Sequence, residues 1–146
     1  MPPPTHSENG TGGLKPYVSV YQAISRLGPS PNLDRPPKFF TQEQMNDANR
    51  KFPIYPYDGH KYLPKAITCG GGGNWHPSGK RDFSLKEYAA LQGFPPVHTF
   101  AGGDGQILEQ IGNAVPPIIA KVLMESIIKD LKAADGIIDG GRIILD

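Results

Sequence analysis

An apolar helix predicted over residues 117–131 constrains the fold more than any other feature of this chain. It begins at two consecutive prolines, and proline is favoured at a helix start because its missing N–H removes no hydrogen bond there. Ile119, Leu123 and Ile127 lie on its main face, and Ile118 is among the residues that widen the stripe. So broad a stripe predicts burial on two sides, since a helix this apolar is rarely left facing water. The other predicted elements include no set of strands for this helix to cover, which indicates a missing partner.

Composition and charge narrow the class of protein. The 146 residues include 18 glycines and 16 prolines against 38% hydrophobic residues, which predicts a chain rich in turns and loops. The net charge of +1 hides an asymmetry: residues 35–81 carry eight Lys or Arg and three acids, whereas residues 82–146 carry five and nine. A basic middle suits a segment that faces phosphates, although a plain solvated loop region explains the charge equally well.

The single cysteine, Cys69, excludes a disulfide framework and a cysteine-based zinc cluster, and it fits a reducing compartment. The first thirty residues lack the apolar core of a signal peptide, and no apolar run approaches the length of a membrane span. His60 and His76 have no cysteine or acid at ligand spacing, so no metal site is expected. These features predict a soluble intracellular protein.

Capping signals mark the other helices. Ser19 with Gln22, and Ser84 with Glu87, have the spacing of a capping box, and Gly93 ends the second of these helices. Further elements are expected at residues 41–50 (a short helix capped by Thr41), 65–69 (a strand closed by four glycines), 106–111 (a short turn of helix) and 136–146 (a small hairpin).

Two stretches, residues 81–95 (RDFSLKEYAALQGFP) and 110–117 (QIGNAVPP), together resemble the last two motifs of the cytosine-5 DNA methyltransferases. Taken alone, the second is also explained by a glycine turn, an asparagine that tolerates positive φ and a proline-initiated core helix. In this order the pair is specific. The resemblance covers residues 65–131 well and residues 1–27 loosely, and the amino-acid sequence of this region is most similar to that of eukaryotic, fungal-type members.

The resemblance implies a parent fold and an activity. The parent is an α/β protein, a doubly wound (Rossmann-like) methyltransferase with a small recognition domain, of which this chain would hold the loop-rich recognition region and the C-terminal helices. Members transfer a methyl group from S-adenosylmethionine to carbon 5 of a cytosine flipped out of DNA. The implied divisions are residues 1–17 (a flexible lead-in), 18–80 (part of the target recognition region), 81–134 (the last two motifs and the C-terminal helix) and 135–146 (a tail).

The family's catalytic groups have no counterpart in these residues. In the family, the catalytic groups are a cysteine in a Pro-Cys-Gln motif and a glutamate in a Glu-Asn-Val motif. Cys69 lacks the Pro and Gln neighbours and is interpreted as a small packing residue. Residues 8–10 (ENG) imitate Glu-Asn-Val, but they lie in a polar lead-in with no scaffold to aim them. No catalytic residue is therefore assigned.

The remaining candidates are assigned by position in the motifs. By resemblance, Asn113, Ala114 and Val115 would line the S-adenosylmethionine pocket, which an absent N-terminal part would complete. Arg81 and Glu87 would hold the recognition region against the catalytic half, although a simple helix-capping role explains Glu87 equally well. The candidate DNA edge combines cations for phosphate with glycines that allow close backbone approach, and it comprises Lys65, Gly70, Gly71, Gly72, Gly73, His76 and Lys80.

Functions of two classes remain open at this point. The first is the C-terminal fragment of a nuclear DNA cytosine-5 methyltransferase, unable to transfer methyl groups alone. The second is a non-catalytic DNA-binding module, or a split-enzyme subunit whose partner chain supplies the catalytic motifs. A truncated gene product without function, prone to aggregate through residues 117–131, is a third reading.

Overall fold

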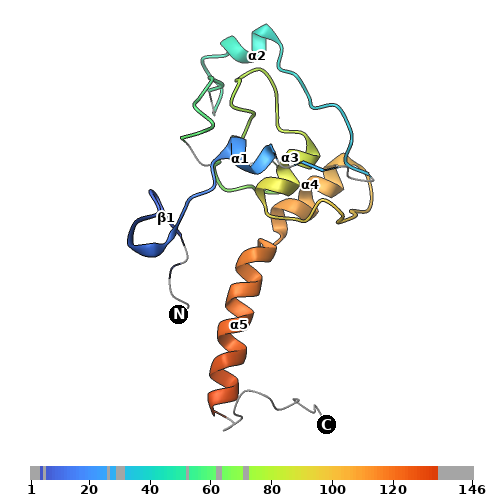
Figure 1. The fold of residues 1–146 in the computed structure, drawn as a ribbon. Helices are drawn as coiled ribbons and strands as arrows, with labels where there is room; N and C mark the ends of the chain where they lie inside the picture. Colours follow the sequence, from blue (N-terminus) through green and yellow to red (C-terminus); the bar gives the residue numbers. More distant parts are fainter. Residues whose placement is uncertain are drawn as a thin grey trace.

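Helices supply most of the regular structure. The computed structural model describes residues 4, 6–25, 27–28, 32–51, 53–61, 64–70 and 73–134. In chain order the elements are β1 (His6–Ser7), η1 (Thr11–Gly13), β2 (Lys15–Pro16), α1 (Val20–Ile24), α2 (Gln42–Asn46), α3 (Leu85–Leu91), α4 (Asp104–Asn113) and α5 (Pro117–Ala134). Figure 1 shows α1, α3 and α4 grouped together, with α2 on a long loop above them and α5 projecting away on its own.

The predicted caps are confirmed. Ser19, Thr41 and Ser84 each accept a hydrogen bond from the backbone N–H three residues on, and the side chain at that position bonds back to the cap residue. Such a pair of bonds satisfies two backbone donors that a helix start leaves open. The helix capped by Thr41 ends at Asn46, four residues earlier than the sequence predicts.

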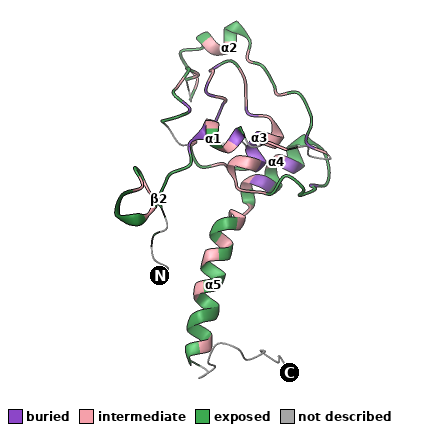
Figure 2. Ribbon diagram, viewed as in Figure 1, coloured by how far each residue is buried: buried purple, intermediate pink, exposed green. Residues whose placement is uncertain are grey.

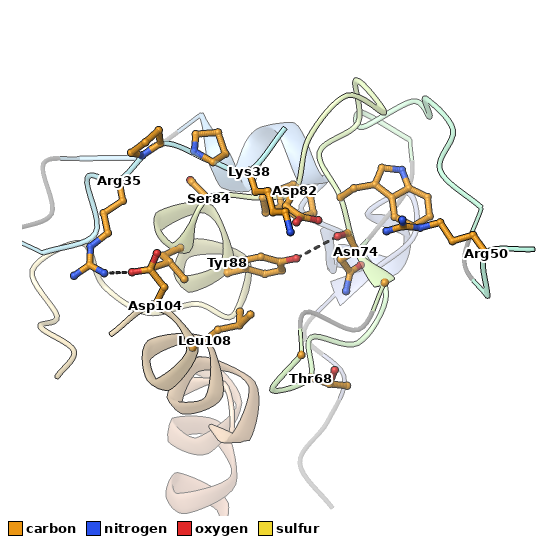
Figure 3. A pocket seen from close by; sticks show the side chains of 18 of the residues that line it. Arg35, Lys38, Arg50, Thr68, Asn74, Asp82, Ser84, Tyr88, Asp104 and Leu108 are labelled. Atoms are coloured by element: carbon orange, nitrogen blue, oxygen red, sulfur yellow. Dashed lines mark hydrogen bonds and ion pairs between the residues drawn. The ribbon is translucent and has the colours of Figure 1, made fainter. Parts of the chain in front are cut away.

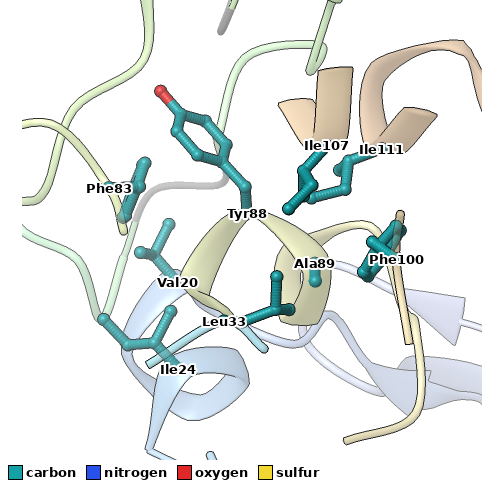
Figure 4. Packing of buried hydrophobic residues seen from close by; sticks show 9 residues of the cluster. All are labelled: Val20, Ile24, Leu33, Phe83, Tyr88, Ala89, Phe100, Ile107 and Ile111. Atoms are coloured by element: carbon teal, nitrogen blue, oxygen red, sulfur yellow. The ribbon is translucent and has the colours of Figure 1, made fainter. Parts of the chain in front are cut away.

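A small core joins α1, α3 and α4 (Figure 4). Each helix contributes one apolar face, and loop residues close the remaining sides. Full burial of one large apolar side chain stabilises a fold by roughly 1.5–3 kcal/mol, so the shared cluster contributes to holding these three short helices together. The cluster comprises Val20, Ile24, Leu33, Phe83, Tyr88, Ala89, Phe100, Ile107 and Ile111.

The strand predicted over residues 65–69 is wrong. No described segment pairs with it; instead the side-chain amide of Asn74 bonds its backbone. Asn74 Oδ1 accepts from the Lys65 N–H at 2.9 Å, and Asn74 Nδ2 lies 3.2 Å from the carbonyl oxygens of both Lys65 and Ala66. These three backbone groups of Lys65 and Ala66 are satisfied without a ladder. The expectation that Cys69 packs inside is also wrong, because it is exposed.

Helix α5 corrects a further expectation. Its broad apolar stripe predicts burial on two sides, yet within the described part of the chain none of its residues is buried (Figure 2). Exposed fractions reach 52% at Ile119, 43% at Leu123 and 48% at Ile127. The described elements leave this helix without a surface to pack on.

The predicted turn near residues 106–111 is the full helix α4. Within residues 1–17, His6 and Ser7 pair in parallel with Lys15 and Pro16. The hairpin predicted over residues 136–146 lies outside the described residues. Helices and short strands together are compatible with an α/β family.

Candidate nucleic-acid and cofactor interface

The two motif stretches, residues 81–95 and 110–117, meet where the C-terminal end of α3 lies beside the C-terminal end of α4. Gln92, at the end of α3, donates from its Nε2 to the carbonyl oxygen of Ala114 at 2.8 Å. Gly93 follows with φ of +82°, a left-handed conformation that glycine adopts without strain, and it ends the helix as predicted. A single side-chain bond thus ties the first stretch to the residues after α4.

Gly112 lies against the backbone of the preceding loop. A Cβ built at this position would come within 2.6 Å of the Thr68 carbonyl oxygen and would also strike the Cys69 nitrogen. Real Cβ atoms do not make such contacts, so only glycine fits here. The close approach that glycine allows is therefore to this chain's own loop.

Asn113, Ala114 and Val115 form the short connection between α4 and α5. Ala114 is extended, with φ of −73° and ψ of 138°, and Asn113 and Val115 are exposed. Within the described ranges no hydrogen bond involves the Asn113 side-chain amide, which leaves its donor and acceptor open. The residues present therefore fit one wall of a small-molecule pocket: a polar side chain beside an exposed apolar one.

Arg81 and Glu87 form a bidentate ion pair. The Nη1–Oε2 distance is 2.7 Å and the Nη2–Oε1 distance is 2.9 Å, and the two side chains are only 18% and 8% exposed. Glu87 also accepts from the Ser84 N–H at 2.8 Å. Burial acts to raise the pKa of Glu87, but the hydrogen bonds from Arg81 and Ser84 outweigh it and hold that pKa below its ordinary value.

The backbone at Arg81 joins residues 38–40 to the first motif stretch. Phe40 N–H donates to the Lys80 carbonyl at 3.0 Å, Asp82 N–H donates to the Lys38 carbonyl at 2.9 Å, and Phe39 and Arg81 form an antiparallel bridge. Burial raises the pKa of Asp82 although Lys38 acts to lower it. The ion pair of Arg81 thus lies where residues 38–40 and the first motif stretch are hydrogen-bonded.

The predicted DNA edge is only partly brought together. Lys65 and Gly73 line a cavity together with Trp75. The Lys65 Nζ lies 5.2 Å from the centre of the Trp75 ring. Gly70 and Gly73 line a second, larger cavity. Lys80 is exposed. Gly71 and Gly72 lie outside the described residues.

His76 of the predicted edge is held by its own neighbours. Its Nδ1 lies 3.0 Å from Ser78 Oγ, and its ring packs edge-on against Tyr21 and Phe83. Burial, and then the charge of Arg81, lower the pKa of His76 and so favour the neutral ring. As a cation for phosphate it contributes little there.

A basic cleft brings together cations that the motif analysis does not single out. It has a volume of about 730 Å³ and lies between residues 35–38, 50–51, 68, 70, 73–75, 82–85 and 88 and the start of α4 (Figure 3). The excess of positive charge in residues 35–81 is the signal that could have indicated it. Its charged lining residues are Arg35, Lys38, Arg50, Lys51, Asp82 and Asp104.

Comparison with known proteins shows the family to which the chain belongs. The model of the C-5 cytosine-specific DNA methylases matches residues 4–129, most of the chain. The chain belongs to this family. The resemblance of the two motif stretches is confirmed at that level, and S-adenosylmethionine is the methyl donor that the family implies.

Two relatives show how much of each protein is matched. The type II methyltransferase M.NgoFVII of Neisseria gonorrhoeae is 33% identical over 150 residues, which cover 87% of this chain and 40% of the relative. M.PspPI of Psychrobacter sp. (strain TA137) is 48% identical over 59 residues, 40% of this chain and 14% of the relative. The chain thus spans less than half the length of these relatives. No solved structure matches it.

The apolar C-terminal region passes a test for membrane spans. The helical region Asp104–Ala134 is long enough to cross a membrane and contains an 18-residue window with a mean hydropathy of 1.4, which corrects the expectation from sequence. Length and composition are weak evidence, however. Ala114, Val115 and Pro116 interrupt the helix, and five charged residues lie between Lys121 and Lys132. The core helix of a soluble protein passes the same test.

Proposed function

We propose that this chain is the C-terminal part of a DNA cytosine-5 methyltransferase, which transfers a methyl group from S-adenosylmethionine to carbon 5 of cytosine in DNA. Residues 18–80 supply part of the target recognition region, and residues 81–134 supply the last two motifs and the C-terminal helix. The family match and the order of the two motif stretches support this assignment. The rest of the parent is the doubly wound, Rossmann-like catalytic half.

The exposed apolar face of α5 is the observation that carries the proposal. Ile119, Leu123 and Ile127 lie along one side of an 18-residue helix and are all more than two-fifths exposed. An apolar face of this length is normally covered. A polypeptide that carries the Pro-Cys-Gln and Glu-Asn-Val motifs, which the 146 residues lack, supplies the covering surface.

In the assembled protein, Asn113, Ala114 and Val115 form one wall of the pocket for S-adenosylmethionine. The open Asn113 amide offers a polar contact, and the bond from Gln92 to the Ala114 carbonyl holds the wall in place. The cofactor supplies the methyl group. This chain's residues orient it and exclude water on one side.

Reconstitution tests the proposal. The 146-residue chain is mixed with a polypeptide from a relative that carries the two catalytic motifs, and transfer of radiolabelled methyl groups to DNA is measured. We expect no transfer by either polypeptide alone and transfer by the mixture. A mixture in which the catalytic cysteine is replaced by alanine is the control. Cytosine methylation by the chain alone, or an inactive mixture in which the two polypeptides bind each other, contradicts the proposal.

A non-catalytic DNA-binding module is the second candidate. The basic cleft favours it, because its cations all come from this one chain and need no partner. This reading predicts salt-dependent DNA binding by the chain alone and no gain in methyl transfer on mixing. The nuclear location and fungal type suggested by the motif wording remain predictions without support from the relatives named above, which are bacterial.

A further inference from the structure

Segment 65–69 lies against the residue that precedes the proposed cofactor wall, residues 113–115. Four residues of this segment are exposed, and Ile67 packs against the core. A Cβ added to Gly112 would overlap the backbone of residues 68–69, so the two stretches touch with no side chain between them. Gly112 is followed at once by the wall. The position of segment 65–69 therefore affects where the wall begins.

Asn74 holds the other end of this segment. Its Oδ1 accepts from the Lys65 N–H at 2.9 Å, and its Nδ2 donates to the carbonyl oxygens of Lys65 and Ala66, each at 3.2 Å. Asn74 is only 7% exposed, so the surrounding protein fixes its position. Because the segment itself is mostly exposed, the bonds from this one amide supply much of what holds its first residues.

Tyr88 of α3 fixes Asn74 to the core (Figure 3). The Tyr88 hydroxyl donates to the Asn74 carbonyl at 3.1 Å, and the Tyr88 ring belongs to the buried cluster. Burial is the largest cause that raises the pKa of Tyr88, so the hydroxyl stays protonated and remains a donor. Helix α4, which contains Gly112, packs against α3. The same pair of helices thus fixes segment 65–69 at both ends.

We propose that Asn74 is a positioning residue for the S-adenosylmethionine wall, because it holds segment 65–69 against Gly112 and so sets how the chain leaves α4 toward residues 113–115. It acts through the segment and not by contact with the cofactor. Without the amide bonds, the segment leaves Gly112 part of the time, and the wall binds its ligand only in the fraction of molecules that keep the correct orientation. This inference rests on the proposed function for the identity of the ligand.

NMR relaxation of the full chain tests the coupling without any cofactor. Asn74→Asp keeps the size of the side chain and the acceptor for the Lys65 N–H, but it places a carboxylate oxygen against the two carbonyls to which Nδ2 donates. We expect the backbone order parameters of residues 113–115 to fall from about 0.85 toward 0.6. Tyr88→Phe removes only the bond to the Asn74 carbonyl, and it should cause a smaller fall at the same residues.

Asn32→Asp is the matched control. Asn32 also donates from its side-chain amide to a backbone carbonyl, that of Phe100, and neither residue belongs to segment 65–69. The change should lower stability to urea and leave the order parameters of residues 113–115 unchanged. If Asn74→Asp does not fold, Tyr88→Phe carries the test alone, because its ring still fills the core.

Kinetics of the reconstituted enzyme test the consequence for the cofactor. At saturating DNA, Asn74→Asp should raise the KM for S-adenosylmethionine about tenfold, as expected if about a tenth of the molecules keep the wall in its binding orientation. Saturating cofactor should return kcat to within about twofold of wild type. A purely structural role predicts the opposite split, a lower kcat that added cofactor does not restore.

Two results overturn the inference. One is wild-type order parameters at residues 113–115 in Asn74→Asp, or an equal fall in Asn32→Asp. The other is an unchanged KM for S-adenosylmethionine in an active mixture. Failed reconstitution with the expected NMR result refutes the proposed function and supports the coupling. Successful reconstitution with unchanged order parameters refutes the coupling and not the proposed function.

Discussion

Replacing Arg81 by methionine should destabilise the chain by about 2–3 kcal/mol, because removal of one partner from a buried ion pair leaves the other charge uncompensated. The figure lies at or below the low end for such losses for two reasons in the structure. Arg81 is 18% exposed, so the pair is not fully desolvated, and Glu87 keeps its bonds from the Ser84 N–H and hydroxyl. Methionine retains the apolar length of the arginine stem, so most of the loss is electrostatic.

Urea unfolding followed by Trp75 emission measures the effect. Trp75 is a suitable reporter because its neighbour His76 donates its backbone N–H to the Arg81 carbonyl at 3.0 Å. Arg81→Met combined with Glu87→Gln should cost at least about 1 kcal/mol less than the sum of the two single changes, as expected for directly coupled residues. The exposed pair Lys121–Glu125 supplies the control, and Lys121→Met should cost less than about 0.5 kcal/mol.

The effect of Arg81→Met should also depend on pH. The pKa of Glu87 is lower in the folded chain than its ordinary value of 4.5, so the unfolded chain takes up the proton first as pH falls. The contribution of the pair is therefore complete above the unfolded-state pKa and is lost as pH falls through the folded-state pKa. The difference between wild type and variant should shrink below about pH 4.5. Additive single changes, or a difference independent of pH, would refute the reasoning.

Three further changes test the interface. Gly112→Ala should lower the free energy of unfolding by at least about 2 kcal/mol, because its methyl group strikes the Thr68–Cys69 backbone, and urea titration measures this. Gln92→Ala should raise the KM for S-adenosylmethionine about fivefold in the reconstituted enzyme with kcat little changed, as the lost bond to the Ala114 carbonyl is worth about 1 kcal/mol. Leu123→Glu should change the stability of the chain by less than about 0.5 kcal/mol, because the site is exposed, yet cut reconstituted methyl transfer at least tenfold.

Each of these has an opposing result. Wild-type stability of Gly112→Ala would mean that the loop at Thr68 moves away at little cost. A lower kcat with unchanged KM in Gln92→Ala would place its role outside cofactor binding. Full methyl transfer by Leu123→Glu would mean that the face of α5 is not the contact surface.

Local chemistry made much of the fold predictable. The capping pairs at Ser19 and Ser84 lie within four residues, so sequence alone contains the whole interaction. The sequence does not predict the conformation of the segment at Lys65, because its partner is one side chain nine residues away and no strand pattern encodes such a contact. The cleft was missed because its cations come from separate loops. Segment 35–38 reaches it through backbone pairing of residues 38–40 with residues 80–82 and through the ion pair of Arg35 with Asp104, and Arg50 lies over the Phe40 ring.

The way Asn74 holds residues 65–66 has a consequence for how such a protein can diversify. A strand in a sheet must keep its register, so an insertion of one residue turns every later side chain to the opposite face. A backbone segment fixed by the amide of one asparagine has no register to keep. A residue added just before Lys65 can therefore leave this anchor in place. An enzyme that must acquire new DNA sequence preferences gains from variation that leaves the surrounding scaffold untouched.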